Sequence, residues 1–425
     1  MSGIEPCQTK VETRHRAERL RFAVAAVSLV AGIAALPSET MAQQWLFTPV
    51  VEIGVQHIDN PRLIEGDVDT DNITGGMVDV AAEMRRNTQI SSILFRPAAA
   101  IYRYSGDSDE DSESYFMDFD ANRTGQRSQW RFTANFSQQQ VFRGETTSSE
   151  IDDPGVDDSD QTGTGRTFER RERDLWRVRP GATFNFTERT ALKLDFNYLN
   201  AQYDTQEVGE AVDYWNGRAD ASIVRALTPD SDLEFGVFAS RYDPDRLNGE
   251  TDSTGVRARY QKEVSDISTF FIEVGAQNSD VPSVVNPGTE SSESSFLWSM
   301  GYARQLQRTR WRFDIGQAVT PSGSGVLVER DQFRVSMQHQ LRPRWALMLS
   351  AVALNTGGVA EEDIVTTNDR DYLQGRVALA YEMSLNWTVE GLYGLTYQDF
   401  ADIEGDAQEH EVRLSLIYRP PLPTR

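Results

Sequence analysis

Apolar and polar residues alternate one by one over long stretches of this chain. Between 192 and 198, Leu, Leu, Phe and Tyr alternate with Lys, Asp and Asn, and the same period recurs over 256–261, 310–315, 373–383 and 412–418. A period of two places every second side chain on the same face of a β-strand. The sequence therefore predicts an all-β chain in which each strand has one apolar and one polar face.

The length of these strands separates two architectures. A soluble sandwich, with its apolar faces turned inward, would show the same alternation. The expected strands run for about 10–15 residues, whereas strands of soluble proteins average five or six and membrane-spanning strands need about ten. The length favours a transmembrane β-barrel.

The connections between the expected strands alternate between short and long. Short periplasmic turns and long outer loops are typical of outer-membrane barrels, and about nine long loops with about eight short turns predict about 18 antiparallel strands with both chain ends in the periplasm. Short turns are expected at 187–190, 228–231, 265–266, 308–309, 342–344 and near Asn386, and long loops at 59–72, 105–113, 144–168, 204–211, 243–253, 279–293, 320–326, 356–370 and 401–408.

The tryptophans fall into two groups along the expected strands. Indole rings prefer the interface between membrane and water, so a spanning barrel should carry two aromatic girdles. A sandwich gives no reason for such a division. One group opens strands that leave the short turns, and the other lies in the outer halves of strands that return from long loops: Trp45, Trp130, Trp311, Trp345 and Trp387, against Trp176, Trp215 and Trp298.

Composition excludes several other classes of protein. The chain has 425 residues, is 39% hydrophobic and, outside one N-terminal stretch, lacks the long apolar runs that a helical membrane bundle needs. Its net charge of −23 makes binding to nucleic acid unlikely, since such proteins need a basic face for the phosphates. A single cysteine excludes a disulfide scaffold and a cysteine-based zinc site.

The N-terminus reads as an export signal. Five basic residues precede an apolar stretch from Phe22 to Leu36, and Thr40-Met41-Ala42 offers the small residues that a signal peptidase prefers. That stretch is short for a spanning helix, which needs about 20 residues, although an uncleaved anchor is the alternative. We therefore expect a signal peptide at 1–42, an outer-membrane barrel at 43–419 and a proline-rich periplasmic tail at 420–425.

Charge is distributed unevenly between loops and strands. The expected loops carry 34 acidic and four basic residues, so the remainder of the mature chain is net basic. A charge in the lipid face costs about 2–4 kcal/mol at mid-depth, so the basic residues of the strands are expected to line the lumen. They either neutralise carboxylates on the same face or form an anion-selective path, as charged rings do in pores. The basic residues are Arg131, Arg177, Arg179, Lys193, Arg218, Arg257, Arg259, Arg310, Arg312, Arg330, Arg334, Arg376 and Arg413. The carboxylates expected beside them are Glu52, Asp118, Asp120, Asp195, Asp220, Glu263, Asp314 and Glu382.

Catalytic and metal-binding patterns are weak. His57, His339 and His410 lie on distant strands, and no catalytic serine, zinc-protease or phosphate-loop motif is present. Asp67, Asp69 and Asp71 have the spacing of a calcium loop, but Asn72 and Val78 replace its glycine and glutamate. We expect neither an enzyme nor a cofactor or metal site; weak Ca²⁺ binding by the acidic loop residues Asp107, Asp109, Glu110 and Asp111 stays open.

One short pattern carries a family resemblance. Val51-Glu52-Ile53-Gly54-Val55 followed by Asp59-Asn60-Pro61-Arg62-Leu63 resembles the start of the outer-membrane β-barrel porin 2 family, which often has an Asp-Asn pair after its first strand. Over about 45–419 the rest of the resemblance is architectural. Members resemble barrels associated with exopolysaccharide export, so the resemblance implies a role in moving or presenting surface polysaccharide. It implies no catalytic residues.

Two functions fit these patterns. The first is an outer-membrane pore with a polar, arginine-bearing lumen that passes anionic solutes or exports an exopolysaccharide. The second is a closed barrel that binds surface glycans or has a structural role, and the loop at 144–168 would decide between them by folding inward or outward. The partners expected are outer-membrane lipid and lipopolysaccharide, the barrel-insertion machinery, which would read the terminal aromatic Tyr418, and polysaccharide or periplasmic export components.

Overall fold

The computed structural model describes residues 45–61, 63, 72–105, 111–140, 172–204, 212–245, 250–282, 290–323, 325–359, 369–401 and 405–420. The expected signal peptide and almost all of the expected tail lie outside these residues. Within them, no helix is long and apolar enough to cross a membrane. The strands are β1 (Trp45–Ile58), β2 (Ile73–Asn87), β3 (Ser91–Ser105), β4 (Ser112–Thr124), β5 (Ser128–Gln140), β6 (Glu172–Thr187), β7 (Thr190–Tyr203), β8 (Tyr214–Thr228), β9 (Ser231–Pro244), β10 (Thr251–Ser265), β11 (Ser268–Pro282), β12 (Glu290–Gln305), β13 (Thr309–Pro321), β14 (Leu327–Arg342), β15 (Trp345–Gly358), β16 (Arg370–Glu382), β17 (Trp387–Phe400) and β18 (Asp406–Tyr418).

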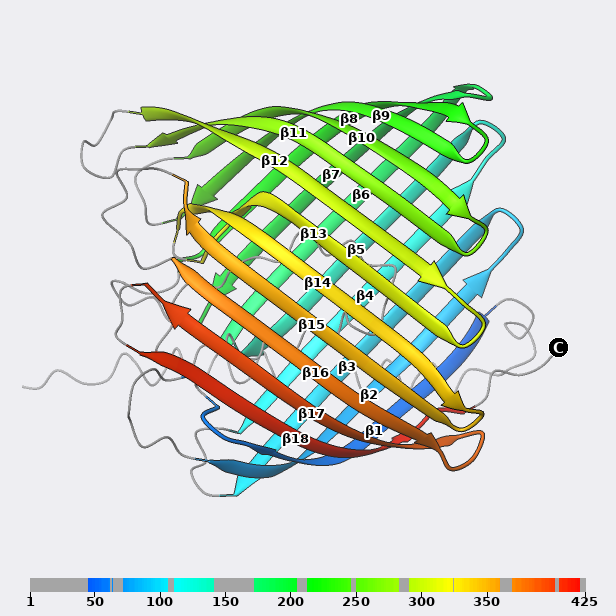
Figure 1. The fold of residues 1–425 in the computed structure, drawn as a ribbon, viewed down its shortest axis with the longest axis vertical. Helices are drawn as coiled ribbons and strands as arrows, with labels where there is room; N and C mark the ends of the chain where they lie inside the picture. Colours follow the sequence, from blue (N-terminus) through cyan, green and yellow to red (C-terminus); the bar gives the residue numbers. More distant parts are fainter. Residues whose placement is uncertain are drawn as a thin grey trace, which may run out of the picture.

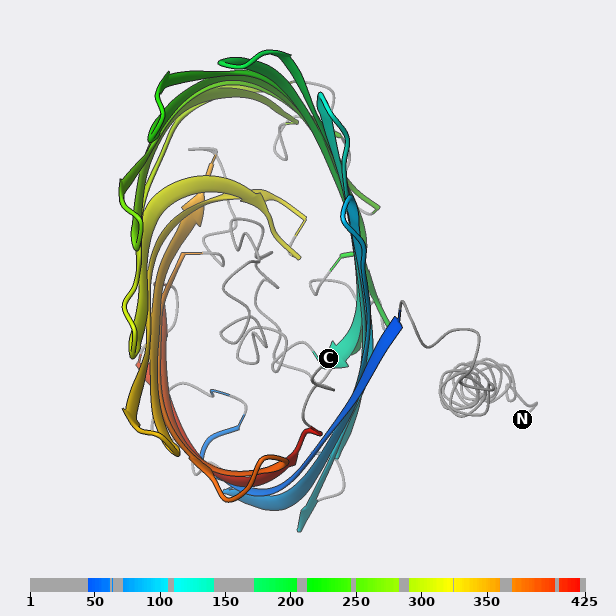
Figure 2. The ribbon, with the colours of Figure 1, turned by 90° about the vertical axis from the view of Figure 1, so that its right-hand side faces the viewer.

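These 18 strands form one closed antiparallel barrel (Figure 1, Figure 2). Each strand pairs with its neighbours along the chain, and β1 also pairs with β18, which closes the sheet. All short turns lie at one end of the barrel and the long connections at the other (Figure 1). The predicted fold class and strand number are therefore confirmed.

Two prolines interrupt the ladders between neighbouring strands. The β2–β3 ladder has no pairs between Ala81↔Ala98 and Met84↔Phe95, a stretch that contains Pro97. The β6–β7 ladder has a similar interruption beside Pro180, between Val178 and Gly181. Proline has no N–H to donate to a ladder, so each interruption has a local chemical cause.

The outer face of the barrel is apolar. Large side chains such as Ile53, Val55, Phe235, Val237 and Val256 lie exposed on it. The pairing register also turns every one of the eight tryptophans outward. Five lie near the short turns and Trp176 and Trp215 near the long loops, whereas Trp298, expected in the outer half of its strand, lies at the middle of β12. An apolar band between two aromatic girdles is the surface of a barrel that spans the outer membrane.

One hairpin leaves this wall. The β12–β13 ladder runs only from Gln305↔Arg310 to Trp298↔Gln317, although both strands continue beyond Trp298 and Gln317. Figure 2 shows the β13–β14 hairpin, in yellow-green, bending from the wall into the barrel interior. In β14 the ladder to β15 continues to Val328↔Gly358, so the far side of the hairpin stays attached to the wall.

Candidate channel interior

The register places the predicted lumen residues on one face. Residues that are paired across antiparallel strands point to the same side of the sheet, and alternate residues point to opposite sides. The face opposite the exposed apolar side chains carries all thirteen basic residues expected in the lumen. They are Arg131, Arg177, Arg179, Lys193, Arg218, Arg257, Arg259, Arg310, Arg312, Arg330, Arg334, Arg376 and Arg413.

Arg257 is the centre of a charge network on this inner wall. Its guanidinium lies 3.1 Å from a carboxylate oxygen of Glu234, 3.5 Å from Glu273 and 3.6 Å from Asp220. The four residues come from β8, β9, β10 and β11, and the side chain of Arg257 is 16% exposed. A guanidinium has five donors in a fixed fork, so one arginine can bind carboxylates on several strands.

The network continues on both sides of Arg257. Arg259 lies 3.8 Å from Glu273, and Lys193 lies 3.8 Å from Glu234. Other inward pairs among the described residues are Arg218–Asp220 at 3.0 Å, Lys193–Asp195 at 3.5 Å, Arg131–Asp195 at 3.2 Å, Arg312–Asp314 at 2.6 Å and Arg85–Glu83 at 2.8 Å. The inner wall from β5 to β11 therefore carries both signs of charge in close contact.

Exposure differs between the members of these pairs. The side chain of Arg131 is 59% exposed and that of Asp195 is 24% exposed. Arg218 likewise exceeds Asp220, at 29% against 13%, and Arg312 exceeds Asp314, at 34% against 21%. In these three pairs the base is the more exposed member, whereas in the central pair Arg257–Glu273 the carboxylate is, at 24% against 16%.

Sequence reasoning missed part of this network. It placed Glu52, Asp118, Asp120, Asp195, Asp220, Glu263, Asp314 and Glu382 on the inner face, where the register also has them. It did not include Glu234 and Glu273, which hold Arg257. The alternation of Asp232 and Glu234 with Leu233 and Phe235 was the signal that could have found the first.

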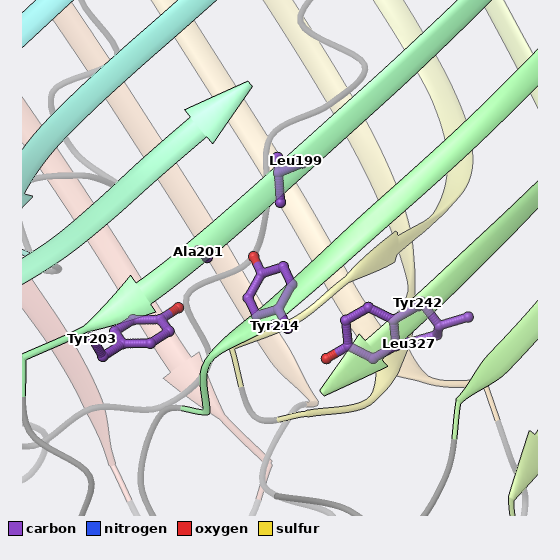
Figure 3. Close-up of a cluster of buried hydrophobic side chains, with 6 residues drawn as sticks. All are labelled: Leu199, Ala201, Tyr203, Tyr214, Tyr242 and Leu327. Carbon is purple, nitrogen blue, oxygen red and sulfur yellow. The ribbon is translucent and has the colours of Figure 1, made fainter. Parts of the chain in front are cut away.

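The tip of the β13–β14 hairpin docks on the inner wall at β7, β8 and β9. The hydroxyl of Tyr242 donates a hydrogen bond to the carbonyl oxygen of Ser322 at 2.9 Å, and the N–H of Val212 donates to the carbonyl of Gly323 at 2.7 Å. Figure 3 shows Leu327 of this hairpin among inner-wall side chains of β7, β8 and β9. That buried cluster consists of Leu199, Ala201, Tyr203, Tyr214, Tyr242 and Leu327.

The face that the hairpin presents to this cluster is unexpected. Val319 and Leu327 belong to the register that faces outward in the rest of β13 and β14, yet both pack on inner-wall residues. The reason is geometric: a flap that folds inward from the wall turns its outer face toward the inner surface of the neighbouring wall. An apolar outer face thereby becomes buried without meeting lipid. The hairpin therefore narrows the lumen at the long-loop end.

Several other predicted sites are only partly described. The loop at 144–168 and the acidic residues Asp67, Asp69, Asp71, Asp107, Asp109 and Glu110 lie outside the described residues. Asp111 is described, and its carboxylate accepts a hydrogen bond from the N–H of Tyr104 at 2.8 Å and lies 3.7 Å from Arg103. Within the described part of the chain, no group of acidic, histidine or cysteine side chains could hold a metal.

The histidines face outward and contact neighbouring hydroxyls. His57 lies 2.7 Å from the hydroxyl of Thr74, and His339 lies 2.8 Å from that of Thr309. His410 lies 2.8 Å from the hydroxyl of Tyr393. Each contact joins two adjacent strands, so these histidines have a structural environment on the outside of the wall.

Comparison with known proteins gives likeness at the level of overall shape. No family model matches the chain. No curated protein matches it. Solved structures that are similar include OccAB4 of Acinetobacter baumannii and OpdQ of Pseudomonas aeruginosa, each at 8% identity and a TM-score of 0.43, covering 89% of this chain and 98% of theirs. The FrpB iron transporter from Neisseria meningitidis has 8% identity and a TM-score of 0.45, covering 88% and 82%.

The strand ladder itself establishes the fold of this chain.

Proposed function

We propose that this protein is an outer-membrane pore that passes anionic solutes through a lumen narrowed by the β13–β14 hairpin. The observation that carries the proposal is the exposure of the inward bases, as in Arg131 beside Asp195. Carboxylates that lie close to the wall hold each guanidinium in place while part of it stays accessible to water. A passing anion can then pair with successive bases weakly enough to leave each of them, which conduction requires.

The geometry of the arginines favours oxyanions. A guanidinium fork matches a carboxylate, sulfate or phosphate with two parallel hydrogen bonds. Arg218 and Arg259 are held in a fixed orientation by ring contacts, with guanidinium carbons 3.8 Å from the centroid of Phe238 and 4.1 Å from that of Phe271. Arginines that are already oriented lose less entropy when a solute binds, so the path suits brief contacts with small oxyanions.

An acidic exopolysaccharide is the second cargo that we propose, together with membership of the outer-membrane β-barrel porin 2 family. Its support is the Asp59-Asn60 pair after β1, on which the resemblance depends. A glycan strand carries carboxylates at regular intervals, and the inner wall offers bases on successive strands. A glycan strand is wider than a small solute, so the docked hairpin would hinder its passage more.

Single-channel conductance of the purified mature protein in a planar bilayer tests the pore. With a salt gradient, we expect steady conductance steps and a reversal potential displaced toward that of anions. Reversing the charge of Arg310 and Arg312 should reduce this anion preference, and reversal of Arg257 and Arg259 should do so further. Folding of each variant is checked by its slower migration after heating on a denaturing gel. Cation preference in the unmodified protein would contradict the proposal.

Cargo size is tested by blocking. Phosphate, a short uronic acid oligosaccharide and a long acidic polysaccharide are added in turn to the conducting protein. Small oxyanions should shorten open times at millimolar concentration, and a neutral oligosaccharide of the same length serves as control. Block by the long polysaccharide from the short-turn side would support export, whereas block by small oxyanions alone would support solute passage.

A closed barrel with a surface role is favoured by one observation, the burial of Tyr214 and Tyr242 beneath the hairpin. If the hairpin closes the lumen completely, folded protein will not conduct. A variant in which residues 319–327 are replaced by a short glycine-containing turn separates the two functions. Conductance that appears only in this variant would assign the unmodified protein to the closed state.

A further inference from the structure

Charges on the outward face of the strands are segregated by end. Across the described strands, outward charged side chains are confined to the two rims. The rim near the long loops carries mainly carboxylates, including Asp174, Asp243, Asp252, Asp280, Asp331 and Asp371. The rim near the short turns carries only bases among its described strand residues: Arg86, Arg123, Arg225, Lys262, Arg304 and Arg342.

Four of these six bases are direct cross-strand partners of girdle tryptophans. The register pairs Arg86 with Trp45, Arg123 with Trp130, Arg304 with Trp311 and Arg342 with Trp345. The guanidinium carbon of Arg86 lies 5.9 Å from the centroid of the Trp45 ring, within the range of a cation–π contact. Because indoles mark the headgroup level of a membrane, the bases lie at that level too.

The short turns themselves carry both signs of charge. Arg127, Arg189 and Arg308 lie there, and so do Glu188, Asp230 and Asp266. The excess of bases is therefore a property of the outward strand register, which faces lipid. It is not a property of the turns, which face water.

We infer that these six outward bases form a collar that binds the phosphate groups of anionic phospholipids in the periplasmic leaflet. The short turns of outer-membrane barrels are periplasmic, and phospholipid headgroups lie at that interface. Clustered lysines and arginines at a membrane surface attract anionic lipid, and a guanidinium forms paired hydrogen bonds with a phosphate. The neighbouring indoles supply a surface for the glycerol and upper acyl chain.

The tryptophans serve as reporters for the experiment. Trp176, Trp215 and Trp298 are changed to Phe, so that fluorescence comes from the short-turn girdle. The mature protein is then reconstituted into phosphatidylcholine vesicles that contain an equal small fraction of either brominated phosphatidylglycerol or brominated phosphatidylcholine. Bromine quenches only tryptophans that it contacts.

The expected result is stronger quenching by the brominated anionic lipid. The variant Arg86→Gln, Arg123→Gln, Arg304→Gln, Arg342→Gln, which removes every base paired with a girdle tryptophan, should quench equally with both lipids, and high salt should reduce the difference in the parent protein. Arg103→Gln and Arg241→Gln, at the opposite rim, are the matched control and should retain the difference. Equal quenching by both lipids in the folded parent would overturn the inference. The measurement does not depend on conductance.

A separate observation concerns the free edge of β12. In the structure, the segment of β12 from 291 to 297 has a ladder partner on its β11 side, but β13 has left its other side. Continuing the observed register would place Leu297 opposite Ala318, Phe296 opposite Val319 and Ser295 opposite Thr320. Phe296 is 59% exposed on the outer face, so Val319 would become its apolar neighbour.

We propose that the β13–β14 hairpin exchanges between two partners, the inner-wall tyrosine cluster and the free edge of β12. In both positions the apolar outer face of the hairpin is removed from water. The docked position packs the half-buried Val319 and the buried Leu327 on the inner-wall tyrosine cluster, and the wall position would place both on the lipid-facing side. Such a segment, with two discrete packing arrangements, is the element that a two-state gate requires. This proposal rests on the pore function for its consequence, which is a change in conductance.

Disulfides can lock either position, because the only cysteine of the chain is Cys7, in the expected signal peptide. Val212→Cys with Gly323→Cys joins residues that already share a backbone hydrogen bond. Ser295→Cys with Thr320→Cys joins the residues that would face each other on the wall. Single-cysteine variants are the controls, and gel mobility before and after reduction measures each cross-link.

We expect both disulfides to form in folded protein. The docked lock should hold conductance at its lower level, the wall lock should raise it severalfold, and reduction should restore the unmodified behaviour in both. Failure of the 295–320 disulfide under oxidising conditions would overturn the exchange whatever the conductance. If both disulfides form and no variant conducts, the exchange stands and the pore function fails.

Discussion

The carboxylate of Asp59 accepts a hydrogen bond from the backbone N–H of His410, although the two residues are 351 positions apart. The N–H of Asp59 in turn donates to the carbonyl of His410 at 3.1 Å, and the side-chain amide of Asn60 donates to the carbonyl of Gln408 at 3.1 Å. The Asp-Asn pair thus joins the end of β1 to the start of β18. The motif therefore has a structural role: it stabilises the junction between β1 and β18 (the seam) at which the barrel closes.

Removal of the Asp59 carboxylate should weaken that seam. We expect Asp59→Ala to lower the free energy of unfolding by about 1–3 kcal/mol, the range for a hydrogen bond to a charged group together with an unsatisfied donor. Urea unfolding from detergent micelles, followed by tryptophan fluorescence, measures the loss. Gln408→Ala is the control, because the contacts of Asp59 and Asn60 with β18 use only the backbone carbonyl of Gln408. Equal loss in both variants would show that the contact is not specific.

Asn60 should be difficult to replace for a second reason. Its φ of 42° lies in the left-handed region, which asparagine and glycine tolerate better than other residues. Asn60→Ala should therefore lose both the hydrogen bond and the backbone preference, about 1–2 kcal/mol in total. Asn60→Gly should recover the backbone part alone. The same urea titration distinguishes the two, and a glycine variant less stable than the alanine variant would contradict this explanation.

Substitutions in the charge network should move ion selectivity in opposite directions. Arg257→Gln leaves Glu234, Glu273 and Asp220 near one another without their shared base, so reversal potentials should shift toward cations. Glu234→Gln should shift them toward anions. Loss of one partner from a largely buried ion pair costs about 3–5 kcal/mol, so Arg257→Gln should also unfold at lower urea concentration. A shift of the same sign in both variants would rule out the network as the source of selectivity.

A close packing contact at Gly255 offers a test of the inner wall itself. A Cβ added there would lie 2.2 Å from the ring of Phe238, which is buried and lies beneath the guanidinium of Arg218. Overpacking of this kind costs about 1–3 kcal/mol, so Gly255→Ala should destabilise the barrel by that amount. Adding Phe238→Leu should restore part of the loss. If the double variant loses more free energy of unfolding than the two single variants lose together, the added methyl group and the Phe238 ring do not compete for space.

Asp245 predicts a pH dependence near the long loops. Burial raises the pKa of the Asp245 carboxyl, and repulsion from Asp213 and Asp243 raises the pKa further. A carboxyl whose pKa is higher in the folded state destabilises the fold when it is ionised, and the cost disappears as the pH falls below its unfolded value. Asp245→Asn should therefore be more stable than the parent at pH 7, with the difference lost toward pH 3. Thermal unfolding at both pH values measures it, and a constant difference would contradict the assignment.

Much of the wall could be predicted from alternation alone. A strand with lipid outside and water inside must change polarity at every residue, so β7, with Leu194 and Phe196 outside and Lys193 and Asp195 inside, is visible directly in the sequence. Around Pro97 the alternation is less regular in the sequence, and the β2–β3 ladder is interrupted at the same place. The tryptophans likewise report the two interfaces, because their preference for that environment is local and strong.

The hairpin could not be predicted in this way. Val319 and Leu327 have the alternation of residues that face lipid, and nothing local distinguishes lipid from the tyrosine-rich inner wall. That choice depends on contacts with Tyr242 and Leu199, which lie far away in the chain. The charge of the wall is a similar case: its excess of bases includes Arg86, Arg123 and Arg304, which the register places outside the lumen.

The closure of β1 on β18 has a consequence for biogenesis. A chain that ended before β18 would leave β1 and β17 with unpaired edges, and open edges are not tolerated in lipid and invite aggregation in water. Any shorter fragment of this sheet would have edge strands whose backbone N–H and C=O groups lack hydrogen-bond partners. Completion of the polypeptide thus becomes a condition for entering the bilayer, and premature termination products would stay in the periplasm as substrates for proteolysis.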